Sequence, residues 1–202
     1  MPRAVGQIDL AKTEAILDAA AQVFGERGLA APMEEIARRA RVSKQTIYNH
    51  YGSKPELIRA IVDRRVSEIA APLLLPEAAD HPEEALAAFG RSMLSAVMLP
   101  RGTSMLRMTV ESAAEQPDLA RAFFEAGPAA SRRRLADFLR METENGRLNV
   151  EDPALAADFF VSMVVGAHQL AHLLGLVGGL DADEIDRIAR EASRRFMKAY
   201  SA

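Results

Sequence analysis

Helix-breaking residues divide most of the chain at regular intervals, and this spacing is the sequence feature that most restricts the fold. Beyond Pro72 the breaks separate segments of roughly 10–25 residues, and apolar residues recur within these segments at helical spacing. The breaks fall at Pro76, Pro82, Pro100, Gly102, Pro117, Gly127, Pro128, Asn145, Gly146, Asp152, Pro153, Gly178 and Gly179. Neither a strand pattern nor an internal repeat is visible. The sequence therefore predicts an all-α fold of about nine or ten helices.

The composition agrees with a folded helical protein and narrows its chemistry. The 202 residues are 49% hydrophobic and 26% charged, which is typical of globular chains, and only 5% are aromatic. Cysteine is absent, so disulfides, thiolate metal sites and cysteine nucleophiles are excluded. The first 15 residues contain no apolar stretch of the kind found in a secretory signal. These features predict a cytoplasmic protein.

Charge is distributed unevenly along the chain. The net charge is −3, but residues 1–66 carry 11 Lys and Arg against 8 Asp and Glu, whereas residues 67–202 carry 14 against 20. Only the N-terminal third therefore has the electrostatic balance that favours a polyanionic partner.

The same N-terminal third has the spacing of a helix-turn-helix. Apolar periodicity predicts a helix over residues 9–28, closed by Gly28, and a short second helix over residues 33–40. A three-residue turn leads to Ser43, which can cap a third helix from Lys44 to His50. Two short helices joined by such a turn are typical of helix-turn-helix motifs. Ser53 can cap a long fourth helix that continues to about residue 74.

These segments resemble the DNA-binding domain of the tetracycline-repressor (TetR/AcrR) family of bacterial regulators. The resemblance covers about residues 10–60, through TEAILDAAAQVFGERGL, MEEIARRA and RVSKQTIYNHYGSKPEL, and continues more weakly over residues 104–175. It implies an N-terminal three-helix DNA-binding domain, residues 1–55, and a C-terminal helical domain for ligand binding and dimerisation, residues 56–202. The expected partners are a palindromic operator in double-stranded DNA, a small molecule and a second copy of the chain. No cofactor is expected.

The third helix suits the major groove, because it carries polar side chains of several lengths while Ile47 points inward. The resemblance implies that Thr46, Tyr48, His50 and Lys54 contact the DNA backbone and that Lys44, Gln45 and Asn49 read bases. The predicted DNA-binding set is Ser43, Lys44, Gln45, Thr46, Tyr48, Asn49, His50 and Lys54.

The sequence departs from the family pattern at two places. Ala31 and Pro32 precede the second helix where the family usually has a capping Ser or Thr, and Arg41 occupies the turn where a small residue is usual. A lost cap destabilises a helix by about 1 kcal/mol. A non-glycine residue in a left-handed turn has a similar effect.

Methionine and phenylalanine are frequent between residues 89 and 168, and such adaptable side chains suit a pocket for an apolar or amphipathic ligand. For any single residue a place in the core is the more common explanation. The candidate ligand-binding set is Met93, Val97, Met105, Met108, Ser112, Phe124, Met163 and His168.

Two C-terminal segments are candidates for the dimer interface. Residues 159–180 contain no charged side chain, but four polar or histidine residues, four glycines and acidic flanks argue for a buried helix rather than a membrane span. We therefore expect one helix over residues 154–178 and another over 182–200, buried in a core or between subunits. The second has an apolar stripe that includes Ile185, Ile188, Ala189, Ala192, Phe196 and Met197. Both helices could also simply close the core of a single chain.

Other functions have weaker support in the sequence. His168 and His172 stand at the i, i+4 spacing of zinc ligands, with Glu142 or Glu144 as further candidates for a metal-responsive regulator. Enzyme motifs such as a phosphate loop or GxSxG are absent, so no enzymatic activity is expected. A helical interaction or ligand-binding module without a DNA role remains an alternative. Arg132, Arg133 and Arg134 are interpreted as a solvated helix face.

Overall fold

The computed structural model describes residues 10–202, which form eleven α-helices. In chain order these are α1 (Leu10–Arg27), α2 (Met33–Ala40), α3 (Lys44–Tyr51), α4 (Lys54–Ala70), α5 (Pro82–Met98), α6 (Pro100–Ser112), α7 (Pro117–Ala126), α8 (Pro128–Glu144), α9 (Pro153–Val165), α10 (His168–Leu173) and α11 (Ala182–Tyr200). Two 3-10 turns, Ala71–Leu74 and Pro76–Ala78, lie between α4 and α5. The described residues contain no strand, which confirms the all-α prediction.

The described residues divide into two compact units. Unit 1 contains residues 10–62 and 104–126, and unit 2 contains residues 63–103 and 127–202. Unit 1 thus holds α1, α2, α3 and the first part of α4, together with α7 and most of α6. The boundary at residue 55, between a DNA-binding domain and a domain for ligand binding and dimerisation, stays a prediction.

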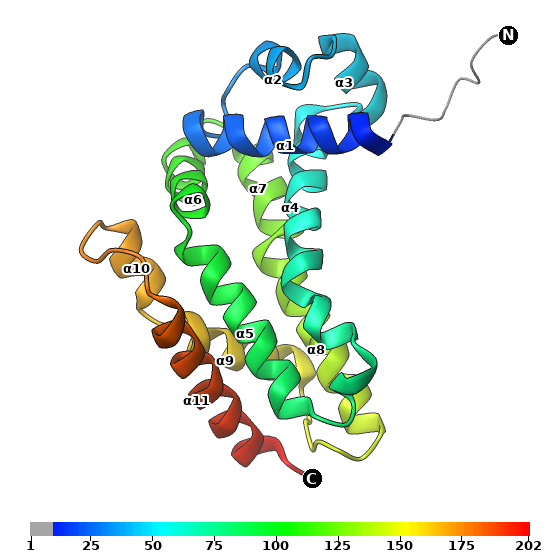
Figure 1. Cartoon of the computed structure of the whole chain (residues 1–202), viewed down its shortest axis with the longest axis vertical. Helices are drawn as coiled ribbons and strands as arrows, with labels where there is room; N and C mark the ends of the chain where they lie inside the picture. Colours follow the sequence, from blue (N-terminus) through cyan, green and yellow to red (C-terminus); the bar gives the residue numbers. More distant parts are fainter. Residues whose placement is uncertain (1–9) are drawn as a thin grey trace, which may run out of the picture. The chain divides into compact units, whose positions relative to one another are not determined.

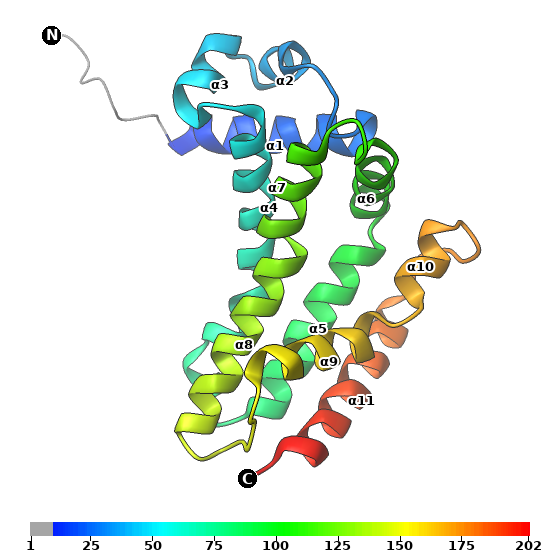
Figure 2. The same cartoon turned by 180° about the vertical axis from the view of Figure 1, so that it is seen from behind.

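Unit 1 is built around α1. Ile16, Ala20, Val23 and Phe24 are completely buried on one face of this helix. In Figures 1 and 2, α2 and α3 lie on one side of α1, and α6 and α7 lie on the other. A small apolar core of this kind holds α2 and α3 in place without involving their exposed faces.

The end of α1 brings α6 close. Gly28 follows the helix with φ 75°, and its N–H donates to the carbonyl of Phe24 at 2.9 Å, as expected for a glycine that ends a helix. A Cβ added to Gly28 would lie 2.9 Å from the Cβ of Met108. The position therefore needs glycine for its backbone angle and for the contact with α6.

The core of unit 2 lies where α5 meets α9 and α11. Phe89, Phe160 and Phe196 are completely buried there, with ring centroids 6.2 Å and 5.4 Å apart for the two successive pairs. A Cβ on Gly90 of α5 would lie 3.3 Å from side-chain atoms of both Ala189 and Val164. Glycine at this position permits the close approach of three helices.

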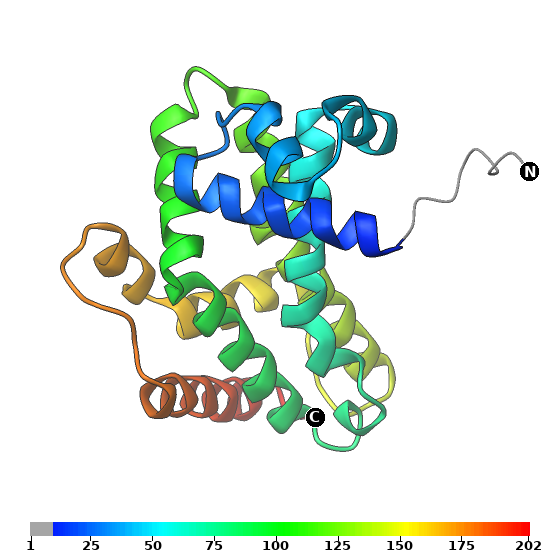
Figure 3. The same cartoon turned by 45° about the horizontal axis from the view of Figure 1, so that its top comes forward.

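The uncharged segment does not form the single helix that the sequence predicted. It breaks at Gly166, where φ is 49° and ψ is −141°, so α9 ends at Val165 and α10 is a separate helix. This break accounts for eleven helices where nine or ten were predicted. No residue of α10 is buried within its own chain, so for this helix the structure supports only the second of the two alternatives, burial between subunits, as a prediction still to be tested. The loop after α10 projects outward (Figure 3) and exposes Leu174 and Leu176.

The apolar stripe of α11 closes the core of unit 2. Ile185, Ala189, Ala192 and Phe196 are buried against the chain's own helices, and Ile188 and Met197 are partly buried against them. Of the two alternatives for this stripe, a core or a subunit interface, the structure supports the core for most of its residues. None of the helices within residues 10–202 is long and apolar enough to cross a membrane.

Candidate nucleic-acid interface and ligand site

The turn between α2 and α3 has the geometry that its sequence predicts. The side chain of Ser43 accepts a hydrogen bond from the backbone N–H of Thr46 at 3.0 Å, which confirms Ser43 as the cap of α3. The N–H of Val42 donates to the carbonyl of Ala37 at 3.0 Å and closes the end of α2. Ile47 is completely buried and anchors α3 in unit 1.

The remaining side chains of α3 form a polar face. Ser43, Lys44, Gln45, Asn49 and His50 are exposed, while Thr46 and Tyr48 are half-buried. The Nε2 of Gln45 donates to the Oδ1 of Asn49 at 2.7 Å, so the two amides form one hydrogen-bonded pair along the helix. An adjacent pair of amides can present both a donor and an acceptor to the edge of a base pair.

Lys44 makes two contacts inside unit 1. Its Nζ donates to the Oε1 of Glu34 on α2 at 2.5 Å and lies 5.8 Å from the centroid of the Tyr48 ring. The hydrogen bond from Lys44 lowers the pKa of Glu34. Sequence reasoning missed this ion pair, because the two residues belong to different helices.

Lys54 stands at the start of α4, where Ser53 accepts a hydrogen bond from the N–H of Glu56 at 3.3 Å and confirms the predicted cap. Its Nζ lies 5.7 Å from the centroid of the Phe24 ring, and partial burial lowers the pKa of Lys54. The positive end of the helix dipole repels a cation at the N-terminus, whereas it attracts an anion. A phosphate bound here would be attracted by the dipole of α4 and by the Lys54 ammonium.

Both departures from the family pattern are present in the structure. Pro32 precedes α2 without a side-chain cap, and Arg41 adopts φ 56° and ψ 39° in the left-handed region. The missing cap and the left-handed arginine are therefore real features of this helix-turn-helix.

The eight candidate ligand-binding residues divide between the two units. Unit 1 contains Met105, Met108 and Ser112 on α6 and Phe124 on α7, whereas unit 2 contains Met93 and Val97 on α5, Met163 on α9 and His168 on α10. Ser112 donates to the carbonyl of Met108 at 2.8 Å, Phe124 is 60% exposed and Met93 is buried. A single pocket lined by the whole set stays a prediction.

Met163 and His168 do lie together on a groove in unit 2. This groove has a volume of about 280 Å³ and is completed by residues of α11, namely Arg187, Ile188, Glu191, Ala192 and Arg195. Its walls combine a methionine, an isoleucine and charged groups, so it suits an amphipathic partner better than a purely apolar one.

The metal-responsive alternative gains no support from the surroundings of the two histidines. The Nδ1 of His172 lies 3.2 Å from the carbonyl oxygen of Val177, a contact that is found in structural histidines and in metal ligands alike. Glu142 binds the guanidinium of Arg147, with distances of 2.5 Å and 2.9 Å. Within the described residues, no group of three or more His, Cys, Asp or Glu side chains is placed to hold a metal ion.

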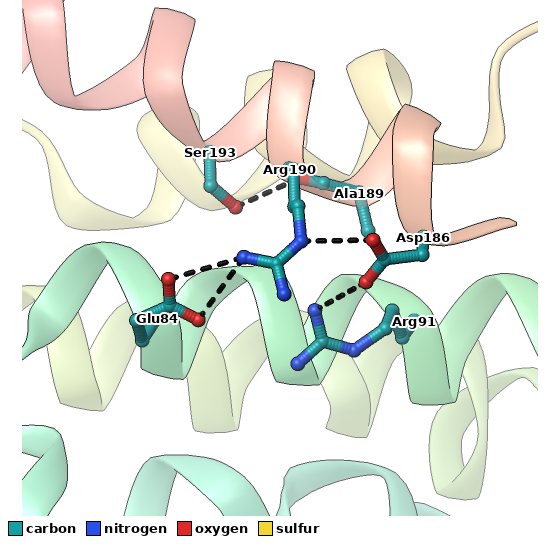
Figure 4. A network of polar contacts seen from close by, with 6 residues as sticks. All are labelled: Glu84, Arg91, Asp186, Ala189, Arg190 and Ser193. Carbon is teal, nitrogen blue, oxygen red and sulfur yellow. Dashed lines mark hydrogen bonds and ion pairs between the residues drawn. The ribbon is translucent and has the colours of Figure 1, made fainter. Parts of the chain in front are cut away.

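An ion-pair network joins α5 to α11 (Figure 4). Arg190 donates to Asp186 at 2.8 Å and to Glu84 at 3.1 Å, and Arg91 donates to Asp186 at 2.9 Å. The hydrogen bond from Arg190, together with Arg91, lowers the pKa of Asp186. Glu84, Asp186 and Arg190 line an open groove of about 760 Å³, and the ion pairs hold the two helices in register. We assign them a structural role.

The interpretation of the three consecutive arginines as a solvated face was wrong for two of them. Arg132 pairs with Asp158 of α9 at 2.8 Å, and Arg134 pairs with Asp63 of α4 at 2.9 Å. Both pairs connect α8 to another helix of unit 2.

Two family models match this chain. One is described as the C-terminal domain of AefR-like transcriptional repressors and matches residues 84–202, more than half of the chain. The other describes bacterial regulatory proteins of the tetR family and matches residues 16–61. The chain belongs to the TetR family. The resemblance read from the sequence is thus confirmed, and TetR-family members are transcriptional regulators rather than enzymes.

Relatives of this TetR-family chain agree with that assignment. An HTH-type transcriptional repressor of Mycobacterium tuberculosis is 31% identical over 113 residues, which is 55% of this chain and 60% of that protein. The chain thus spans about three fifths of the length of this curated relative.

Solved structures of the family extend the likeness to nearly the whole chain. The flavonoid-responsive regulator FrrA is 32% identical, with a TM-score of 0.70, and the match covers 96% of this chain and 98% of that one. A TetR regulator from Agrobacterium tumefaciens has a TM-score of 0.76 at 22% identity over 95% of both chains, which supports the fold alone.

Proposed function

We propose that this protein is a homodimeric transcriptional repressor that binds a palindromic operator through α3 and leaves it when a small molecule binds. The arrangement of α3 carries the proposal: a capped eight-residue helix, anchored by buried Ile47, presents its polar face to solvent. Repression is favoured because a bound dimer can block transcription without any further surface. A cytoplasmic location follows from this proposal, because operator DNA lies there.

The residues of this face divide into two roles. Thr46, Tyr48, His50 and Lys54 position the protein on phosphates, which carry no sequence information. Lys44 and the Gln45–Asn49 pair read base edges in the major groove, and Ser43 holds the first turn of α3 in shape. Lys44 must leave Glu34 to reach DNA, so its contribution to affinity is reduced by the ion pair that it already makes.

A helix-turn-helix reads two half-sites about one helical turn apart only when two copies are held together. The exposed apolar face of α9 is the best candidate for that contact, because Leu155, Phe159 and Met163 recur at i, i+4 and i+8 and are each 40% or more exposed. The groove beside Met163 and the exposed Leu170 of α10 continue this face. We therefore assign the dimer contact to α9, α10 and the adjoining side of α11.

We expect Phe159→Glu to give a folded monomer. The glutamate places a charge in the proposed dimer contact, and the chain still folds because Phe159 is half exposed in the single chain. Light scattering at micromolar concentration, with circular dichroism for folding, measures this. Leu74→Glu is the matched control, since Leu74 is also exposed but lies outside the α9 face. Phe196→Glu is unsuitable, because Phe196 is completely buried and its replacement would unfold unit 2. A monomeric wild type would contradict the assignment.

The ligand that we propose is a flat aromatic molecule with polar substituents. Among the candidate ligand-binding residues, methionine and phenylalanine side chains can adapt to an apolar ring system, and serine and histidine side chains can form hydrogen bonds with polar substituents. The flavonoid-responsive regulator FrrA, 32% identical to this chain, makes flavonoids the first compounds to test.

The test has two steps that use the full chain. Selection from a random duplex library is expected to yield a palindrome with half-sites about one helical turn apart. Flavonoids that raise the unfolding temperature are then added to the protein–operator complex, and we expect roughly 5–150-fold weaker operator binding. Recovery of no common sequence would contradict the operator. Compounds that stabilise the protein yet leave operator affinity unchanged would contradict the release mechanism.

A further inference from the structure

Arg41 has an unusual backbone conformation for an arginine. It stands in the turn between α2 and α3 with φ 56° and ψ 39°, and no other non-glycine residue in the described part of the chain has a positive φ. L-residues with a Cβ are disfavoured in this region, whereas glycine and asparagine adopt it more easily. Two backbone hydrogen bonds close the turn: the N–H of Arg41 donates to the carbonyl of Arg38, and the N–H of Val42 donates to the carbonyl of Ala37. Neither bond needs an arginine side chain at position 41.

The side chain of Arg41 gains nothing inside the protein that offsets this strain. It is exposed, and within residues 10–202 its guanidinium makes no hydrogen bond or ion pair. Three neighbouring cations differ in this respect: Arg38 binds Glu35, Arg39 binds Glu26, and Lys44 binds Glu34. Arg41 is therefore an uncompensated cation held in a strained turn.

The position of the turn indicates where this cation is used. Arg41 lies two residues before Ser43, the cap of α3, and exposed Lys44 and Gln45 form the end of α3 that enters the major groove first. The phosphates that border the groove lie beside that end, and a guanidinium binds phosphate through two parallel N–H donors.

We propose that Arg41 is a phosphate-binding residue of this regulator, retained in a left-handed turn at the expense of stability because its charge strengthens DNA binding. The inference rests on the proposed DNA-binding function and adds a contact outside α3 and the start of α4. It predicts opposite effects of one substitution on stability and on affinity, which a merely solvated arginine would not show.

The test compares Arg41→Asn with Arg41→Lys in the full chain. Asparagine accepts the left-handed conformation and removes the charge, whereas lysine keeps both the strain and the charge. Arg121→Asn is the matched control, because Arg121 is an exposed arginine on α7 of the same unit. Each protein is measured by thermal unfolding and by fluorescence anisotropy on a short duplex of arbitrary sequence over a series of salt concentrations.

We expect Arg41→Asn to unfold at a higher temperature than the wild type, yet to bind the duplex several-fold more weakly. Its plot of log affinity against log salt should be shallower by about 0.9, the contribution of one phosphate contact. Arg41→Lys should keep most of the wild-type slope, and Arg121→Asn should keep all of it.

Three results would overturn the inference. Arg41→Asn with wild-type affinity and slope would show that the arginine is only solvated. An equal loss in Arg121→Asn would show an effect of net charge alone. A wild type that binds no DNA would contradict the proposed function itself, and the wild-type titration identifies that case before any variant is considered.

Discussion

Replacing Arg147 with methionine is expected to destabilise the protein by about 3 kcal/mol, the lower end of the range for breaking a buried ion pair. The Glu142 carboxylate is completely buried, and its two oxygens accept hydrogen bonds from Nε and Nη2 of Arg147. Without the guanidinium, the carboxylate remains in the interior with no charged partner. The lower figure applies because the Arg147 side chain itself is 36% exposed, which weakens the pair. Urea unfolding followed by circular dichroism measures the loss.

Two further variants separate this effect from surface electrostatics. Arg140→Met removes an exposed arginine that pairs with Asp137 one turn away, and we expect a change of less than about 1 kcal/mol. Replacing both Glu142 and Arg147 with apolar residues of similar size should recover much of the stability, because no buried charge is then left unpaired. Equal losses in Arg147→Met and Arg140→Met would show that Glu142 does not need its partner.

The second large effect is expected on DNA binding. Combining Tyr48→Ala with Lys54→Ala should weaken binding to specific and nonspecific DNA alike by roughly 10–100-fold, because contacts with phosphate position the protein without specifying a sequence. Gln45→Ala should instead lose affinity at the operator only and relax the choice at one base position. Anisotropy titrations on operator and arbitrary duplexes measure both variants.

The folding of the variants needs its own control, since Lys54 also contacts the Phe24 ring and Tyr48 is half-buried. Unfolding temperatures close to that of the wild type would assign the loss to DNA contacts. Wild-type affinity on both duplexes in the folded Tyr48→Ala, Lys54→Ala protein would contradict the docking of α3.

Local sequence signals predicted the N-terminal elements well. Gly28, Ser43 and Ser53 end or cap helices as expected, because such effects depend only on residues within one turn. The left-handed Arg41 was also foreseen as a departure, since the turn between two short helices needs that conformation. The roles of the residues on α3 stay predictions.

Features that depend on distant partners could not be predicted in this way. Glu142 looked like one acidic residue among several, and only the chain reversal after α8 brings Arg147 onto it. The break at Gly166 was hidden inside an uncharged stretch that favours a continuous helix. The apolar stripe of α11 correctly predicted that this face is buried. The pattern of one helix does not indicate whether the same chain or a second copy of the chain covers that face.

The dependence of DNA affinity on salt in the wild-type protein tests the central claim most directly. A helix-turn-helix dimer that binds phosphates releases counterions, and each phosphate contact contributes about −0.9 to the slope of log affinity against log salt. We predict a linear plot with a slope of several units, shallower in the variant that lacks Tyr48 and Lys54. Affinity that does not change with salt, or no binding to any duplex at low salt, would contradict the account.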